Sequence, residues 1–291
     1  MIKLKARYSN TTIAILLKLK MKNKRKIPLV VISDIHLGTY GCQATELLQY
    51  LKSIQPKTLV LNGDIIDMWN FSKSYFPSSH MNVLRHIIKM SANGTRLIYI
   101  TGNHDEVLRK YSDLILGKFE LVDKLVLDLD GKKAWIFHGD VFDSSTQGYA
   151  KILAKIGGKG YDLLILINSF LNWIMVLLGK EKRSFSKKVK DSVKKAVAFI
   201  TDFETTAAEI AIDKKFDYVV CGHIHNPQIR TVTNENGSVL YLNSGDWVEN
   251  LTALEYKNAE WSIYQYNKEH YQNSDAVEEL VPVDYASKIL S

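Results

Sequence analysis

Residues 27–38 read IPLVVISDIHLG, an apolar run that passes directly into the polar residues Asp34 and His36. A continuous apolar run of this length is typical of a strand buried on both faces. The polar residues would then lie just beyond the carboxyl end of the strand, where ligand sites of open α/β folds cluster. The stretch therefore predicts an α/β protein with a site at one edge of a sheet.

The segments that follow alternate between helical and strand patterns. Helical spacing covers 44–54 and 81–94, and Gly94 closes the second helix. Apolar runs at 58–64 and 96–105 again end in polar residues, which predicts two further strands with loops at their carboxyl ends. The first hundred residues are thus predicted to form β and α elements in alternation.

The rest of the chain is mostly predicted as strand. Residues 124–140 read as a hairpin that turns at Asp130 and Gly131. Residues 216–266 supply four or five more strands joined by tight turns. The order βαβα followed by β predicts a mixed α/β sheet system with helices outside.

One segment, from about residue 145 to residue 211, has no strand signal. Its apolar run 161–179 is long enough to span a bilayer. The run is interrupted by Asp162, Asn168 and Asn172. A membrane span would also put the two halves of the domain on opposite sides of the membrane, so we reject a membrane span. A buried helix and an inserted helical cap that exposes an apolar face to lipid both remain open, and the Lys-rich stretch that follows favours the cap.

Positive charge is concentrated in two places on a chain of net charge +7. Residues 1–33 contain nine Lys or Arg and no acid, and residues 180–195 contain eight against Glu181 and Asp191. Such patches suit contact with phospholipid or nucleic acid, and solvated faces are the plain alternative.

The cysteines and the N-terminus bear on the compartment. Cys42 and Cys221 are too few for a disulfide framework, which favours an intracellular protein. The N-terminal apolar run IAILL is too short for a signal peptide, and Met21 reads as a more natural start. We expect residues 1–26 to be a basic N-terminal extension without chemistry.

Five short stretches place Asp, His or Asn after predicted strands: SDIHLG (33–38), LNGDIID (61–67), TGNHDE (101–106), FHGD (137–140) and CGHIHN (221–226). Mixed oxygen and imidazole ligands suit Mn, Fe, Zn or Co better than Ca or a Cys-rich zinc site. The cluster is richer than one metal requires. It predicts two metals about 3.5–4 Å apart that share a carboxylate and a water.

These stretches resemble the motifs of the calcineurin-like metallophosphoesterases, D-x-H, G-D-x-x-D, G-N-H-D/E, H and G-H-x-H, in that order from residue 34 to residue 225. The resemblance implies a four-layer α/β/β/α sandwich with an inserted helical cap. It implies a domain at 27–270, with 271–291 as a C-terminal tail.

The resemblance also implies a role for each motif residue. One metal would be held by Asp34, His36, Asp64 and His225, and the other by Asp64, Asn103, His138 and His223. His104 would not bind metal but would stabilise the transferring phosphoryl group or protonate the leaving oxygen, and Asp105 would orient it. Supporting positions would be Asp67, Asp140 and Asn226, while His80, His86 and His270 match no motif and read as core or surface residues.

Among these enzymes, SDIHLG, HGDVFD and the helical insertion resemble the UDP-2,3-diacylglucosamine diphosphatases of lipid A synthesis. The resemblance implies attack of metal-bound hydroxide on the α-phosphorus, giving UMP and 2,3-diacylglucosamine 1-phosphate. It implies a cytoplasmic enzyme, peripheral on the inner face of the membrane through its cap, with two divalent metals, Mn²⁺ first and Fe, Zn or Co as alternatives. Candidate substrate contacts are Arg183, Lys187, Lys190 and Lys194.

One residue departs from this branch, and two other functions stay open. The best-known branch has Arg in GNRD where this chain has His104. A nucleotide or phosphodiester hydrolase, a nuclease included, would use the same metals. A nuclease would not need the apolar run 161–179, so we expect no nucleic-acid partner. A non-catalytic scaffold would be expected to have lost ligands, and here all are intact.

Overall fold

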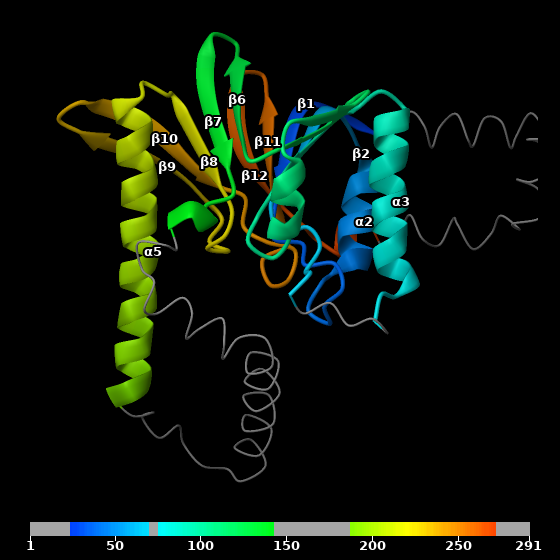
Figure 1. Cartoon of the computed structure of the whole chain (residues 1–291), viewed down its shortest axis with the longest axis horizontal. Coiled ribbons are helices and arrows are strands. Elements are labelled where there is room, and N and C mark those ends of the chain that lie inside the picture. The colour runs from blue at the N-terminus through cyan, green and yellow to red at the C-terminus, as the bar shows by residue number, and fades with distance from the viewer. Residues whose placement is uncertain (1–23, 70–74, 143–186, 272–291) are drawn as a thin grey trace, which may run out of the picture.

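The computed structural model describes residues 24–69, 75–142 and 187–271, with residues 187–199 described by their backbone alone. Within these ranges two β-sheets pack face to face, and helices cover both outer faces (Figure 1). The predicted mixed α/β fold with helices outside two sheets is confirmed.

The first sheet has seven strands in the order β12-β11-β1-β2-β3-β5-β4. Its strands are β1 (Arg25–Ile32), β2 (Ile54–Asn62), β3 (Arg96–Ile100), β4 (Leu114–Leu116), β5 (Phe119–Val122), β11 (Thr252–Lys257) and β12 (Glu260–Gln265). Four of them, β1, β2, β3 and β5, run parallel, so their carboxyl ends meet at one edge. Helices α2 (Ala44–Ser53) and α3 (Ser78–Ala92) make the crossovers.

The second sheet has five strands in the order β6-β7-β8-β10-β9. They are β6 (Lys124–Leu129), β7 (Lys132–Phe137), β8 (Tyr218–Cys221), β9 (Gln228–Asn234) and β10 (Gly237–Asn243). The central strands β7, β8 and β10 are parallel. Helix α5 (Lys187–Asp213) leads into β8 and covers the outer face of this sheet (Figure 1).

The core lies in three layers, one between the sheets and one under each set of helices. Val31, Val60 and Ile98 of the first sheet pack against Ile136 and Val220 of the second. The apolar alternation of these strands directs one set of side chains inward and the other toward the helices. This packing fixes the positions of the strand ends that carry the motif loops.

Several local predictions can be compared with the structure. The hairpin turns at Asp130 (φ 56°) and Gly131 (φ 86°), both left-handed, as the two-residue turn requires. The strand β1 starts at Arg25, so the last residues of the predicted N-terminal extension belong to the sheet. The hairpin of β4 and β5 and the 3₁₀ helix η1 (Glu106–Tyr111) were not predicted.

The predicted cap lies only partly within the described residues. Residues 143–186, with the apolar run 161–179, lie outside them. The end of α5 is no separate cap, because Phe203, Ala207 and Ala211 are buried against the second sheet. Among the described residues, no helix combines the length and apolar composition needed to cross a membrane.

Candidate metal centre

Five loops bring the motif residues together where strands of both sheets end. Asp34 and His36 follow β1, Asp64 follows β2, Asn103 follows β3, His138 follows β7, and the two histidines of the 221–226 stretch follow β8. The predicted ligands therefore come from both sheets and meet at one edge of the sandwich.

The backbone at these positions is unusual. Asp34 (φ 51°), His36 (φ 53°), Asp64 (φ 54°), His223 (φ 68°) and His225 (φ 51°) all adopt left-handed conformations. Such a conformation costs a non-glycine residue roughly 1–2 kcal/mol. Strain of this kind persists where the surrounding structure holds it and is typical of functional sites. Here it coincides with five of the seven predicted ligands.

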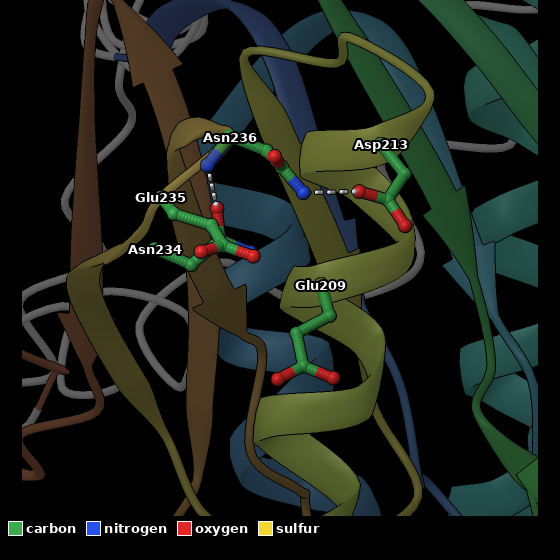
Figure 2. A pocket seen from close by; sticks show the side chains of 5 residues that line it. All are labelled: Glu209, Asp213, Asn234, Glu235 and Asn236. Atoms are coloured by element: carbon green, nitrogen blue, oxygen red, sulfur yellow. Dashed lines mark hydrogen bonds between the residues drawn. The ribbon is translucent and has the colours of Figure 1, made fainter.

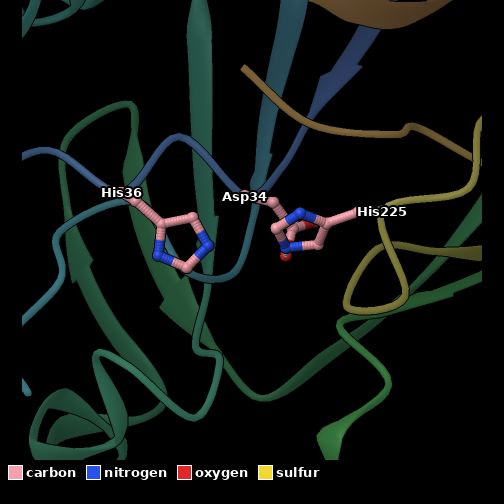
Figure 3. Close-up of side chains that lie close together, drawn as sticks. All are labelled: Asp34, His36 and His225. Carbon is pink, nitrogen blue, oxygen red and sulfur yellow. Dashed lines mark ion pairs between the residues drawn. The ribbon is translucent and has the colours of Figure 1, made fainter. Parts of the chain in front are cut away.

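The first group consists of Asp34, His36 and His225, whose ligand atoms all lie within 4.8 Å of one another. Asp34 is fully buried, and its Oδ1 lies 3.2 Å from Nε2 of His225. Figure 3 shows Asp34 and His225 side by side, with the His36 ring near them. One carboxylate and two imidazoles at this spacing are a ligand set suited to a first-row divalent metal.

The second group consists of Asp64, His138 and His223, again with ligand atoms within 4.8 Å. Oδ2 of Asp64 lies 3.3 Å from Nε2 of His138. Asp64 also forms a group of the same spacing with His36 and His104. Asp64 thus lies between the two sets, which is where a carboxylate shared by two metals must lie.

Asn103 supplies an independent indication that a ligand is bound here. Its Oδ1 is buried and has no hydrogen-bond partner among the described residues. Burying an unsatisfied polar oxygen costs about 1–3 kcal/mol. A metal ion would accept this amide oxygen as a ligand, so the residues present fit the dimetal centre that the sequence implied.

Neighbouring groups fix the orientation of the histidine rings. Nδ1 of His138 lies 2.8 Å from the carbonyl oxygen of Asn62, which leaves Nε2 directed at Asp64. Nδ1 of His36 lies 3.4 Å from Oδ2 of Asp67. Holding one ring nitrogen in this way sets which nitrogen is available to a metal.

The charged groups shift one another's pKa strongly. Burial raises the pKa of Asp34, but His225 and His138 outweigh it and hold that pKa at about 2. Burial lowers the pKa of His225, but Asp34 outweighs it and raises that pKa to about 9. By the same balance, His138 holds the pKa of Asp64 far below its usual value. Each shift favours the ionised carboxylates and the protonated His225.

The structure corrects the predicted partner of His104. Its Nδ1 lies 3.0 Å from Oδ2 of Asp67, and its ring lies against Trp69 at a tilt of 33°, with ring centroids 4.4 Å apart. Asp105 instead accepts hydrogen bonds from the backbone N–H of Gly102 and Ile65 and from the hydroxyl of Tyr99. Asp105 therefore holds the loop together, and Asp67 orients the imidazole.

The other residues singled out in the sequence lie around the centre, elsewhere on the fold, or outside the described side chains. Asp140 accepts a hydrogen bond from Arg109 at 2.7 Å, and Asn226 donates one to Glu204 at 3.1 Å. His80 is buried and accepts a hydrogen bond from the backbone of Gly38. His86 is half-buried and His270 is exposed. Arg183 lies outside the described residues, and Lys187, Lys190 and Lys194 are on α5 where only the backbone is described.

Sequence reasoning missed one part of the centre, the loop after β10. Asp246 is buried, accepts hydrogen bonds from the backbone N–H of Val248 and Glu249, and lies 3.9 Å from Nδ1 of His225. Asn250 donates to the carbonyl of His225 at 2.9 Å. The signal was present, because NSGD at 243–246 is again a polar group after a strand.

A cavity of about 380 Å³ lies apart from these residues. It is lined by Glu209, Asp213 and the β9–β10 turn at 234–236, and Figure 2 shows its exposed carboxylates. It contains none of the motif residues. The candidate centre is defined by its converging side chains.

Fold, motif order and ligand groups define a dinuclear metallohydrolase. The chain belongs to the calcineurin-like phosphoesterase family, whose sequence model matches residues 27–227, and it is a metal-dependent phosphoesterase.

Two named relatives and one solved structure are similar to this chain over about four fifths of its length. A UDP-2,3-diacylglucosamine hydrolase of Aliivibrio fischeri (strain MJ11) is 22% identical over 246 residues, 81% of this chain and 98% of that protein. A protein of the same name from Neisseria gonorrhoeae is 27% identical over 231 residues, 78% of this chain and 92% of that protein. A solved structure of an archaeal phosphodiesterase covers 81% of this chain and 98% of its own, at 14% identity and a TM-score of 0.41.

Proposed function

We propose that the protein hydrolyses the diphosphate of UDP-2,3-diacylglucosamine to UMP and 2,3-diacylglucosamine 1-phosphate. The observation that supports phosphoester chemistry is the pair of ligand groups that meet at Asp64. The observation that supports this substrate is the name that both relatives carry over about four fifths of the chain.

The ligands divide between two ions. Asp34, His36, Asp64 and His225 would hold one, and Asp64, Asn103, His138 and His223 the other. Two divalent ions bound here would supply a nucleophile from water at neutral pH and would neutralise phosphate charge. Mn²⁺ is the first candidate, because mixed carboxylate, amide and imidazole ligands suit it.

The geometry supports His104 as the residue that would act on the substrate. Its Nε2 lies 3.9 Å from Oδ2 of Asp64, beside the shared carboxylate, and Asp67 fixes its other nitrogen. Water oxygen bonds to the α-phosphorus, and the bond from that phosphorus to the bridging oxygen breaks. His104 would donate a hydrogen bond or a proton to the oxygen that leaves with the sugar phosphate.

The lipid substrate requires contact with a membrane surface. The apolar run 161–179 and the basic residues Arg183, Lys187, Lys190 and Lys194 would supply a monotopic surface on the cytoplasmic face. Deletion of residues 145–200 is expected to release the protein from vesicles and to abolish turnover of the lipid. Turnover of a small chromogenic phosphodiester should remain, and a deletion protein that unfolds would contradict the cap.

The first experiment is a direct assay with Mn²⁺ and UDP-2,3-diacylglucosamine, in which mass spectrometry detects UMP and the acylated sugar phosphate. Asp64→Ala should abolish both products, whereas Asp213→Ala, an exposed carboxylate on α5, should leave them unchanged.

A specific residue supports a second candidate, hydrolysis of another phosphodiester or nucleotide. His104 stands where the best-known branch has Arg, and the two side chains differ in reach and charge. Absence of UMP together with Asp64-dependent turnover of a generic phosphodiester would favour this candidate.

A further inference from the structure

Helix α5 places two consecutive residues against the loops of the metal centre. Phe203 is 3% exposed and Glu204 is 5% exposed. Lys187, at the start of the same helix, is 17 residues before Glu204, or about 25 Å along the axis at 1.5 Å per residue. A single helix, Lys187–Asp213, thus carries both residues along the outer face of the second sheet (Figure 1).

The carboxylate of Glu204 joins α5 to the loop after β8. Its Oε1 accepts a hydrogen bond from Nδ2 of Asn226 at 3.1 Å, and its Oε2 accepts one from Nη2 of Arg230 at 2.8 Å. Asn226 directly follows His225. A buried carboxylate with a hydrogen-bond partner on each oxygen is held in one position, unlike a solvated side chain.

Phe203 packs against the same region from the adjacent position. Its ring centroid lies 6.1 Å from that of His223. A Cβ at Gly139, next to His138, would lie 2.7 Å from the Phe203 ring, so only glycine allows this approach. At Phe203 and Glu204, helix α5 therefore contacts two loops that carry ligands, the one after β7 and the one after β8.

The loop after β8 needs such support. His223 and His225 both have left-handed backbones, which relax unless neighbours hold them. The carbonyl of Gly222 is held from the sheet by Asn243. The backbone N–H of His223 donates to Asp34, and Asn250 donates to the His225 carbonyl. Glu204 adds a contact at the next residue, because it accepts a hydrogen bond from the side chain of Asn226.

We infer that Glu204 is a positioning residue for the metal centre, which holds the loop of His223 and His225 through Asn226 and couples α5 to metal binding. This inference rests on the metal centre of the proposed function. Coupling is reciprocal, so docking of α5 strengthens metal binding and bound metal strengthens docking of α5.

The test measures Mn²⁺ binding to metal-free full-length protein by calorimetry. Glu204→Ala and Asn226→Ala should each weaken binding about tenfold, in the range seen for groups that orient ligands. Their effects should not add in the double variant, because both remove one contact. Glu204→Gln keeps an acceptor for Asn226 and should recover most of the affinity.

A control variant separates this role from a general loss of structure. Glu209→Ala, on an exposed face of the same helix, should bind Mn²⁺ within twofold of the native protein. If Asn226→Ala binds normally, or if Glu209→Ala is as weak as Glu204→Ala, the inference is wrong. A native protein that binds no Mn²⁺ would instead overturn the proposed function.

Hydrogen exchange gives a readout independent of activity. Saturating Mn²⁺ should slow exchange of the amides at 200–212 in the native protein and in Glu209→Ala, but much less in Asn226→Ala. Equal protection in all three would contradict the coupling.

Discussion

His104 is surrounded by groups that leave its ring little freedom. Asp67 lies at its Nδ1, the tilted ring of Trp69 contacts it, and His36 meets it edge-on with ring centroids 4.6 Å apart. The remaining nitrogen points toward Asp64, beside both ligand groups. The ring is therefore fixed by its neighbours before any substrate arrives.

Two carboxylates near His104 should behave differently when neutralised. Asp67→Asn weakens the hold on the imidazole, so kcat should fall about 10- to 100-fold with little change in the free energy of unfolding. Asp105→Asn should lower the free energy of unfolding by about 1–3 kcal/mol, because an amide group would face a backbone donor.

Urea unfolding and steady-state assays on both variants check this. The reversed pattern, with Asp105→Asn stable but slow and Asp67→Asn unstable but active, would return the orienting role to Asp105.

The metal ligands could be predicted from the sequence, but the residue that contacts His104 could not. Each predicted ligand follows a strand directly, so its position is set by strand order and by the parallel sheet edge. Asp67 and Asp105 both lie in motif loops, and which of them turns toward the imidazole depends on the path of two loops that touch only in the folded chain. The backbone of Met68 donates to the carbonyl of His104 at 3.0 Å, which fixes that path.

At the scale of elements, the motif glycines let the loops approach one another. A Cβ at Gly102 would lie 2.3 Å from Oδ1 of Asp64, and a Cβ at Gly63 would lie 2.3 Å from Nδ1 of His138. The loops after β2, β3 and β7 are thus in contact through positions without side chains.

Gly102→Ala is expected to displace Asp64 and to reduce Mn²⁺ affinity at least tenfold, as measured by calorimetry. Gly131→Ala is the matched control, since that glycine has φ 86° and open space around it. The control should lose roughly 1 kcal/mol of stability and no metal affinity. Equal affinity in the two variants would mean that Asp64 is not held at the predicted distance.

Elements were predictable in proportion to the strength of their local signals. The hairpin at Asp130 and Gly131 was predicted correctly, because few other residue pairs adopt the left-handed conformations of its turn. Strand β4 has only three residues, all exposed, so neither length nor alternation marks it. The boundary of the insertion could not be read from pattern, because α5 is one continuous helix whose later residues are buried only by the second sheet.

At the scale of the whole molecule, the centre joins the two sheets. Asp34, His36, Asp64 and Asn103 extend from the first sheet, and His138, His223 and His225 extend from the second. A metal ion therefore binds to the two sheets in their packed arrangement. Metal binding should stabilise this folded state by mass action.

The stabilisation by Mn²⁺ should grow with pH between about 6 and 9. In the metal-free protein Asp34 raises the pKa of His225 to about 9 against the opposing effect of burial. That ion pair stabilises the metal-free fold fully below the unfolded pKa of about 6.5, and the benefit is lost as pH rises through 9. Metal ligation requires neutral imidazole, so a metal displaces that proton more easily at higher pH.

The measurement is the difference in Tm with and without Mn²⁺ at each pH. His225→Ala should remove most of the rise, and His270→Ala, an exposed histidine, should leave it intact. A Tm difference that stays constant or shrinks as pH rises would contradict the predicted exchange of proton for metal.

Because both sheets supply ligands to the centre, the ligands are synthesised at widely separated times. Ligands are spread from residue 34 to residue 225, and the last two enter only with the loop after β8. A ribosome-bound chain that ends before residue 222 can present the ligands of the first sheet and His138, but neither histidine of that loop. Metal loading must therefore wait until most of the chain has left the ribosome, so the enzyme cannot acquire activity while its first half is being synthesised.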